Sequence, residues 1–147
     1  MTEQLHIRIS QTGDYKFEVD FGGAMTPLTT DLPPPLGHAD GPSPEHLLLA
    51  AVANCLSASL LFALRKFKQN TDHIKTSITC SLDRDADRRL RITHINAHIN
   101  LGRPAHEFDH LERVLSQFEA FCTVTQSVQA GIPMTVQVQD STGQQLK

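Results

Sequence analysis

The chain of 147 residues has no excess of basic residues: 13 lysines and arginines stand against 16 aspartates and glutamates, for a formal net charge of −3. Proteins that bind nucleic acid or anionic membranes usually carry a basic patch, so we expect neither partner. The first residues, MTEQLHIRIS, lack the basic and apolar stretches of a secretory signal. Three cysteines are too few, and odd in number, for a disulfide scaffold. We therefore expect a cytoplasmic protein in a reducing compartment.

The long uncharged run from Leu47 to Leu64 raises the question of a membrane span. It is 18 residues long, which is at the low edge for crossing a bilayer. Asn54, Cys55 and Ser57 make it more polar than a typical span. The rest of the chain alternates apolar and polar residues, as half-buried strands do. We interpret the run as a central, buried helix.

The order of predicted elements indicates an α+β fold in one domain, residues 1–147. Ser43 followed by Pro44 predicts a helix start, since serine caps helices and proline suits the first helical position. An apolar stripe at helical spacing predicts a second core helix that begins near Pro104 and ends before Gly131. The expected strands cover residues 5–9, 15–21, 25–28, 74–82, 90–101 and 134–138, and the expected first helix covers residues 44–68.

The stretch His106-Glu107-Phe108-Asp109-His110 fits the zinc-binding pattern H-E-x-x-H. A zinc hydrolase is nevertheless the weakest interpretation. Asp109 adds a charge inside the motif, the match opens a helix instead of lying within one, and no third ligand follows at a recognisable spacing. We expect His106 and His110 to face water, His94 and His98 to be surface residues, and no metal to be bound.

The cysteines differ in their surroundings. Cys80 lies among the apolar residues of a predicted strand and is interpreted as a buried hydrophobe. Cys55 and Cys122 each lie on a predicted core helix, where packing alone also accounts for cysteine. Both are bordered by small polar residues, which suit a pocket, and the two helices must pack together. The pair is therefore open to either interpretation, core packing or chemistry.

Two motifs resemble the OsmC/Ohr family of osmotically inducible and organic hydroperoxide resistance proteins. The first is GPSPEHLLLAAVANC, and FCTVTQSVQAGIPMTVQV follows with its cysteine 67 positions after the first one. In that family a Pro-Glu pair opens the central helix and a cysteine follows ten residues later, as Glu45 and Cys55 do. A second cysteine opens a Cys-Pro-x-Ser-like segment before a Gly-x-Pro turn, similar to Cys122 and Gly131. The order of strands and helices extends the resemblance over essentially the whole chain.

The resemblance implies an OsmC-like fold and a thiol peroxidase that needs no bound cofactor. Cys55 would attack an organic hydroperoxide and become a sulfenic acid, Cys122 would condense with it to a disulfide, and a dithiol reductant would restore both. Glu45 would complete the site. Ten residues of straight helix are about 15 Å of rise and roughly 80° of rotation, so Glu45 must come from a partner subunit unless the helix bends. The family's intertwined homodimer would supply it.

The sequence departs from the family pattern at the positively charged residue that accompanies the glutamate. The family pairs its glutamate with an arginine ahead of the central helix, whereas Arg8 is the only arginine before position 65 here. The candidates for activating Cys55 are His38, Arg8 and a helix N-terminus. Thr123 also replaces the proline after the second cysteine. The alternative function is therefore a non-enzymatic dimer of this fold that binds an apolar ligand or acts as a redox-sensitive module.

Overall fold

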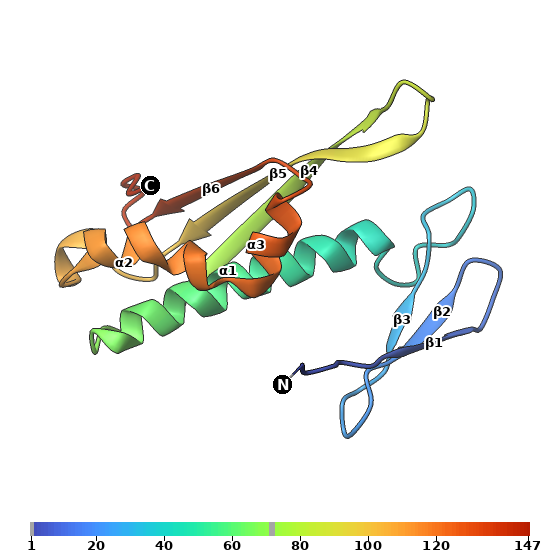
Figure 1. Ribbon diagram of the computed structural model, residues 1–147, viewed down its shortest axis with the longest axis horizontal. Coiled ribbons are helices and arrows are strands. Elements are labelled where there is room, and N and C mark those ends of the chain that lie inside the picture. Colours follow the sequence, from blue (N-terminus) through green and yellow to red (C-terminus); the bar gives the residue numbers. More distant parts are fainter. Residues whose placement is uncertain (1, 71–72) are drawn as a thin grey trace. The chain divides into compact units, whose positions relative to one another are not determined.

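The computed structural model of the chain describes residues 2–70 and 73–147. The chain divides into two compact units, Met1–Leu48 and Leu49–Lys147, and each is described by itself. The first contains a small antiparallel sheet, and the second contains a mixed sheet with several helical segments (Figure 1). The α+β class is confirmed. That residues 1–147 act as a single domain stays a prediction.

The first unit carries a three-stranded antiparallel sheet in the order β1-β2-β3. The last strand starts three residues later than the sequence predicts, because Gly22 and Gly23 both take positive φ and lengthen the preceding turn. Val19 in the central strand is buried, while the first strand is exposed on both faces. The strands are β1 (Arg8–Gln11), β2 (Phe17–Asp20) and β3 (Leu28–Thr30).

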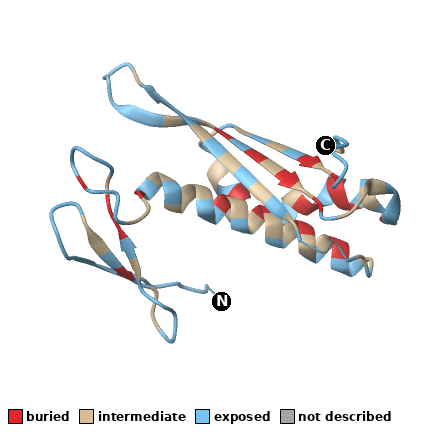
Figure 2. Ribbon diagram, turned by 180° about the vertical axis from the view of Figure 1, so that it is seen from behind, coloured by how far each residue is buried: buried red, intermediate tan, exposed pale blue. Residues whose placement is uncertain are grey.

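The long helix α1 (Pro44–Lys66) ends within two residues of its predicted limit. Its fully buried side chains recur every four residues along one stripe: Val52, Leu56, Leu60 and Leu64. The other sides are half-buried or exposed (Figure 2). By length and composition α1 could cross a membrane, with a mean hydropathy of 2.2 and 22% of its most apolar window buried. The core helix of a soluble protein passes the same test.

The second unit is built on a three-stranded sheet in the order β4-β5-β6. The first two strands pair antiparallel and the last two parallel, so a crossover must connect them. Apolar side chains from α1, from the inner face of this sheet and from the crossover form one core, which appears as the buried residues in Figure 2. The strands are β4 (Lys75–Arg84), β5 (Leu90–Asn100) and β6 (Met134–Gln139), as the alternation predicts.

The predicted continuous second helix is wrong in one respect, because the crossover consists of four short segments. His110 takes a positive φ of 58° and separates the first segment from the next. Cys122 has extended backbone angles and ends the apolar stripe at the start of a new helix. The segments are η1 (Ala105–Glu107), α2 (Leu111–Gln117), η2 (Phe118–Phe121) and α3 (Thr123–Gln129).

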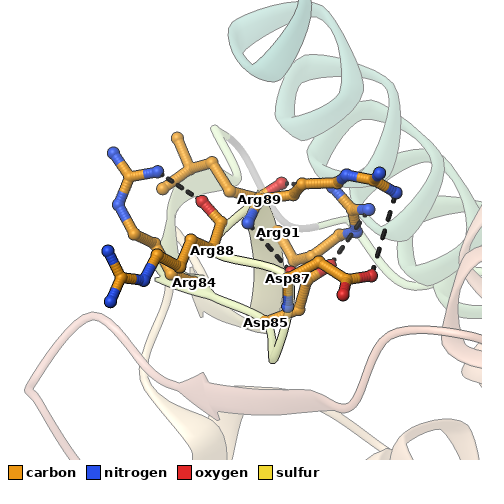
Figure 3. A network of polar contacts seen from close by, with 7 residues as sticks. Arg84, Asp85, Asp87, Arg88, Arg89 and Arg91 are labelled. Atoms are coloured by element: carbon orange, nitrogen blue, oxygen red, sulfur yellow. Dashed lines mark hydrogen bonds and ion pairs between the residues drawn. The ribbon is translucent and has the colours of Figure 1, made fainter.

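The turn between β4 and β5 is charged and internally bonded (Figure 3). Asp85 accepts hydrogen bonds from the backbone N–H groups of Asp87 and Arg89, and its carboxylate lies 3.0 Å from Arg91. Arg84 donates to the carbonyl of Arg88 across the turn. These bonds satisfy the polar groups of the turn, which is therefore interpreted as a structural hairpin end.

Candidate redox site

Cys55 on α1 and Cys122 at the start of α3 form a disulfide, with their Cα atoms 5.7 Å apart. This separation lies in the usual range for disulfides, about 4.4–6.8 Å. The sequence-based expectation that the two core segments bring these cysteines together is met, although they are 67 positions apart. Cys122 stands at the break before α3, where its backbone is extended.

The two sulfurs differ in accessibility. Cys122 is completely buried, whereas Cys55 is partly exposed. Cys122 also contacts a hydroxyl: its Sγ lies 2.7 Å from Oγ1 of Thr125, which is itself 1% exposed. Of the two residues, Cys55 is therefore the one with surface exposed to solvent.

Glu45 lies in the first turn of α1, where Ser43 caps the helix as predicted. The Ser43 hydroxyl donates to Oε2 of Glu45 at 2.7 Å and accepts from the backbone N–H of His46. The backbone N–H of Ser43 donates in return to Nδ1 of His46. The hydrogen bond from Ser43 holds the pKa of Glu45 below its usual value, assisted by the backbone N–H of Glu45 itself. Glu45 is therefore a carboxylate at neutral pH.

The loop ahead of α1 is organised by the buried Asp31. Its carboxylate accepts from the backbone N–H groups of Leu32, His38 and Asp40. Burial opposes ionisation of Asp31, but these three bonds outweigh it and lower its pKa. The side chain of His38 is exposed, and so is that of Arg8 on β1. That either residue activates Cys55 stays a prediction.

Two hollows of the second unit flank α1. One has a volume of about 640 Å³ and is lined by the small polar and apolar residues beside Cys55, among them Asn54, Ser57 and Ala58. The other, about 250 Å³, is lined by aromatic rings, and Lys66 lies 5.7 Å from the ring of Phe62 and 5.8 Å from that of Phe121. Of the apolar residues on these two segments, Leu56 and Leu60 are buried, whereas Phe62 and Phe121 are exposed.

The predicted zinc alternative finds no support in the described residues, which contain no group of three potential ligands. His106 and His110 are exposed, as expected, and lie on different segments. His94 and His98 were predicted as surface residues but are half-buried. His94 bonds to Thr135 across the ladder, and Nε2 of His98 has no hydrogen-bond partner in the described part of the chain.

Cys80 is a free cysteine and is half-buried. It lies opposite Ile95 in the ladder between β4 and β5. The prediction that Cys80 is a buried hydrophobe is therefore met only in part, because the residue is half-buried. The residue that sequence reasoning did not assign is Thr125. Its position three residues after Cys122, at helical spacing, is the signal that could have identified it.

Fold and site together define an α+β protein with a cysteine pair that joins its long helix to its crossover. The family described as OsmC-like protein matches residues 37–137. Because this match spans most of the chain, the chain belongs to that family. The comparison with curated proteins gives no match.

Solved structures agree with the fold. An OsmC-like protein of unknown function from Vibrio cholerae has a TM-score of 0.78 at 12% identity and covers 94% of this chain and 100% of its own. An OsmC-like protein from Mycoplasma pneumoniae gives 0.77 at 17% identity, with 95% and 99% covered. The organic hydroperoxide resistance protein OhrB of Bacillus subtilis gives 0.69 at 15% identity, with 93% and 98% covered. At these identities the likeness shows the fold alone.

Proposed function

We propose that the chain is a cysteine-based peroxidase that reduces organic hydroperoxides with electrons from a dithiol. The observation that carries the proposal is the pairing of Cys55 with Cys122, whose Cα atoms lie 5.7 Å apart. Family membership and the hydroperoxide resistance proteins among the structural neighbours support it. Two cysteines that pack only as hydrophobes have no need to bring their Cα atoms within the distance range of a disulfide.

The accessible and the buried sulfur take different roles. The Cys55 thiolate attacks the O–O bond of the hydroperoxide. One oxygen stays on sulfur as a sulfenic acid, and the other leaves as an alcohol after taking a proton. The Cys122 thiolate then attacks the sulfenic sulfur, the S–S bond forms, and water leaves. A dithiol reductant reduces the disulfide and is itself oxidised.

Glu45 is the third proposed catalytic residue. Its carboxylate is ionised and oriented by Ser43, so it can accept a hydrogen bond or fix a cation near the thiolate. Because α1 is one helix from Pro44 to Lys66, the ten residues between Glu45 and Cys55 favour a glutamate from the partner subunit. His38 or Arg8 would supply the cation that lowers the pKa of a reactive thiol.

A homodimer is part of the proposal, because α1 buries only one of its sides in this chain. A second copy would cover the remaining apolar surface. The exposed phenyl rings of Phe62 and Phe121 favour an alkyl or aryl hydroperoxide over hydrogen peroxide. We also propose a cytoplasmic location, where dithiol reductants are available.

A second function has one observation in its favour. α1 has no charged side chain between Leu47 and Leu64, so no cation lies within two turns of Cys55 on its own helix, whose basic residues Arg65 and Lys66 are in the last turn. A non-enzymatic dimer that binds an apolar ligand needs no activated thiol. It would leave the cysteines as inert or merely redox-sensitive groups.

The two functions separate in a peroxide-consumption assay. Reduced protein is mixed with cumene hydroperoxide and dithiothreitol, and the remaining hydroperoxide is measured for the wild type and for Cys55→Ser. A peroxidase consumes the substrate over many turnovers, and the serine variant falls to the background rate. Equal background rates for both proteins would support the binding module instead.

A further inference from the structure

The hydroxyl of Thr125 is buried and contacts a sulfur. Thr125 lies in the first turn of α3 with 1% of its surface exposed, and its Oγ1 is 2.7 Å from the Cys122 Sγ. Two helical serines of this fold bond back to a carbonyl four residues earlier, Ser57 to Ala53 and Ser127 to Thr123. Thr125 instead directs its hydroxyl to the cysteine three positions before it.

The surroundings of this pair are apolar and would strengthen a hydrogen bond to a Cys122 thiolate. Cys122 belongs to the apolar core together with Leu115, Phe118 and Val138. α3 has no charged side chain, and Glu119 on the preceding segment is paired with Lys147 at 2.9 Å. A hydrogen bond to an anion in such an apolar setting is stronger than one between neutral groups.

We propose that Thr125 is a positioning residue for Cys122, which donates its O–H to the sulfur whenever that sulfur carries the negative charge. The inference rests on the proposed two-cysteine chemistry. The charge develops in both halves of the cycle. Cys122 attacks the Cys55 sulfenic acid as a thiolate, and it is the thiolate that leaves when the disulfide is reduced.

The contact also decides which sulfur the reductant attacks. An external thiolate forms a new S–S bond with one sulfur, the Cys55–Cys122 bond breaks, and the electron pair goes to the other sulfur. The better leaving group is the sulfur whose thiolate is more stable. Stabilisation by Thr125 makes Cys122 the leaving group, so the attack goes to Cys55, which is also the accessible sulfur.

The experiment measures the reduction potential of the disulfide in dithiothreitol redox buffers from pH 6 to 9, by thiol alkylation and mass. Thr125→Val is nearly isosteric and has no hydroxyl, whereas Thr125→Ser keeps it. Without the hydroxyl, the reduced form should lose stability at alkaline pH. We expect the equilibrium constant for reduction by dithiothreitol to fall about tenfold, which is equivalent to a shift of about 30 mV toward more negative potential. The difference should shrink at acid pH, where Cys122 is a thiol and a weak hydrogen-bond donor.

Three comparisons keep the result decisive. Thr125→Ser should stay within about threefold of the wild type, and Ser127→Ala, which removes a hydroxyl from the same helix, should leave the potential unchanged. If Thr125→Val fails to fold, Thr125→Ala is the second hydroxyl-free variant. The proposal is overturned if a hydroxyl-free variant keeps the wild-type reduction potential at every pH. It is also overturned if Thr125→Ser shifts the potential as far as Thr125→Val does. No peroxide enters this measurement, so the role of Thr125 can hold even if the peroxidase assay fails.

Discussion

Cys55 and Cys122 lie on segments that are 67 positions apart, yet their Cα atoms are separated by only 5.7 Å. The contact joins α1, the longest helix, to the first residue before α3. It also combines an accessible sulfur with a buried one. This asymmetry is the basis for proposing Cys55 as the peroxide-reactive residue and Cys122 as the resolving one.

Removal of the resolving cysteine should expose Cys55 to overoxidation. In Cys122→Ser, excess cumene hydroperoxide should convert Cys55 to the sulfinic acid, seen by mass as two added oxygen atoms, because no second thiol captures the sulfenic acid. The matched control is Cys80→Ser, which should keep wild-type turnover with a modest loss of stability from a half-buried hydroxyl. Equal overoxidation of the wild type and Cys122→Ser would contradict the role of Cys122.

The uncovered side of α1 should be a subunit interface. Ala58 is exposed and lies opposite the buried stripe that contains Leu56 and Leu60. We expect the wild type to sediment as a dimer at micromolar concentration. Ala58→Arg should shift it to a monomer, because a charge would enter the apolar interface. Ala130→Arg, at an exposed position after α3, is the control that should remain dimeric. A monomeric wild type would refute the interface.

The sequence predicted those elements whose cause is local. Ser43 and Pro44 set the start of α1 correctly, because capping depends on neighbouring residues. The alternation from Leu90 onward gave β5 nearly to its last residue. The cysteine contact itself was expected from the packing of two core segments and from a family resemblance, and neither of these required knowledge of the exact turn.

The breaks in the crossover could not be predicted, because the apolar stripe keeps helical spacing through them. His110 and Cys122 leave the helical conformation, and tertiary contacts of the core and the cysteine pair decide this, not local propensity. The alternation of Leu5, Ile7 and Ile9 predicted one buried face, yet all three are exposed in this chain. The alternation shows that one face of the strand is apolar, but it does not show what buries that face.

Asp140 should make stability depend on acid pH. Burial opposes its ionisation, but hydrogen bonds from the backbone of Ala105, the hydroxyl of Thr142 and the backbone of Gln144 lower its pKa from 3.8 to about 2. A depressed pKa stabilises the fold fully above the unfolded value, and that contribution is lost as the pH falls from about 4 to about 2.

The matched variant for this effect is Asp140→Asn, which removes the charge and one acceptor oxygen. Urea unfolding of the reduced proteins should give a lower free energy of unfolding for the variant at pH 7. The gap between the two proteins should narrow as the pH approaches 2. A gap of constant size over that range would show that the charge of Asp140 does not contribute.

Gly41 should tolerate no side chain. A Cβ at this position would collide with the backbone carbonyl of Thr29, where the loop before α1 runs against β3. We expect Gly41→Ala to cost about 1–3 kcal/mol in the free energy of unfolding, as overpacking does. Gly131→Ala is the control, because a Cβ there meets nothing within 4 Å. It should change stability by less than about 0.5 kcal/mol. Equal effects of both substitutions would contradict the close approach.

The two-cysteine chemistry is tested most directly by an anaerobic titration of the fully reduced protein with cumene hydroperoxide, followed by peptide mass mapping. We expect one equivalent of hydroperoxide to remove two thiols and to produce a single intramolecular disulfide between Cys55 and Cys122, while Cys80 remains free. A protein that keeps all three thiols, or one whose oxidation falls on Cys80, would contradict it.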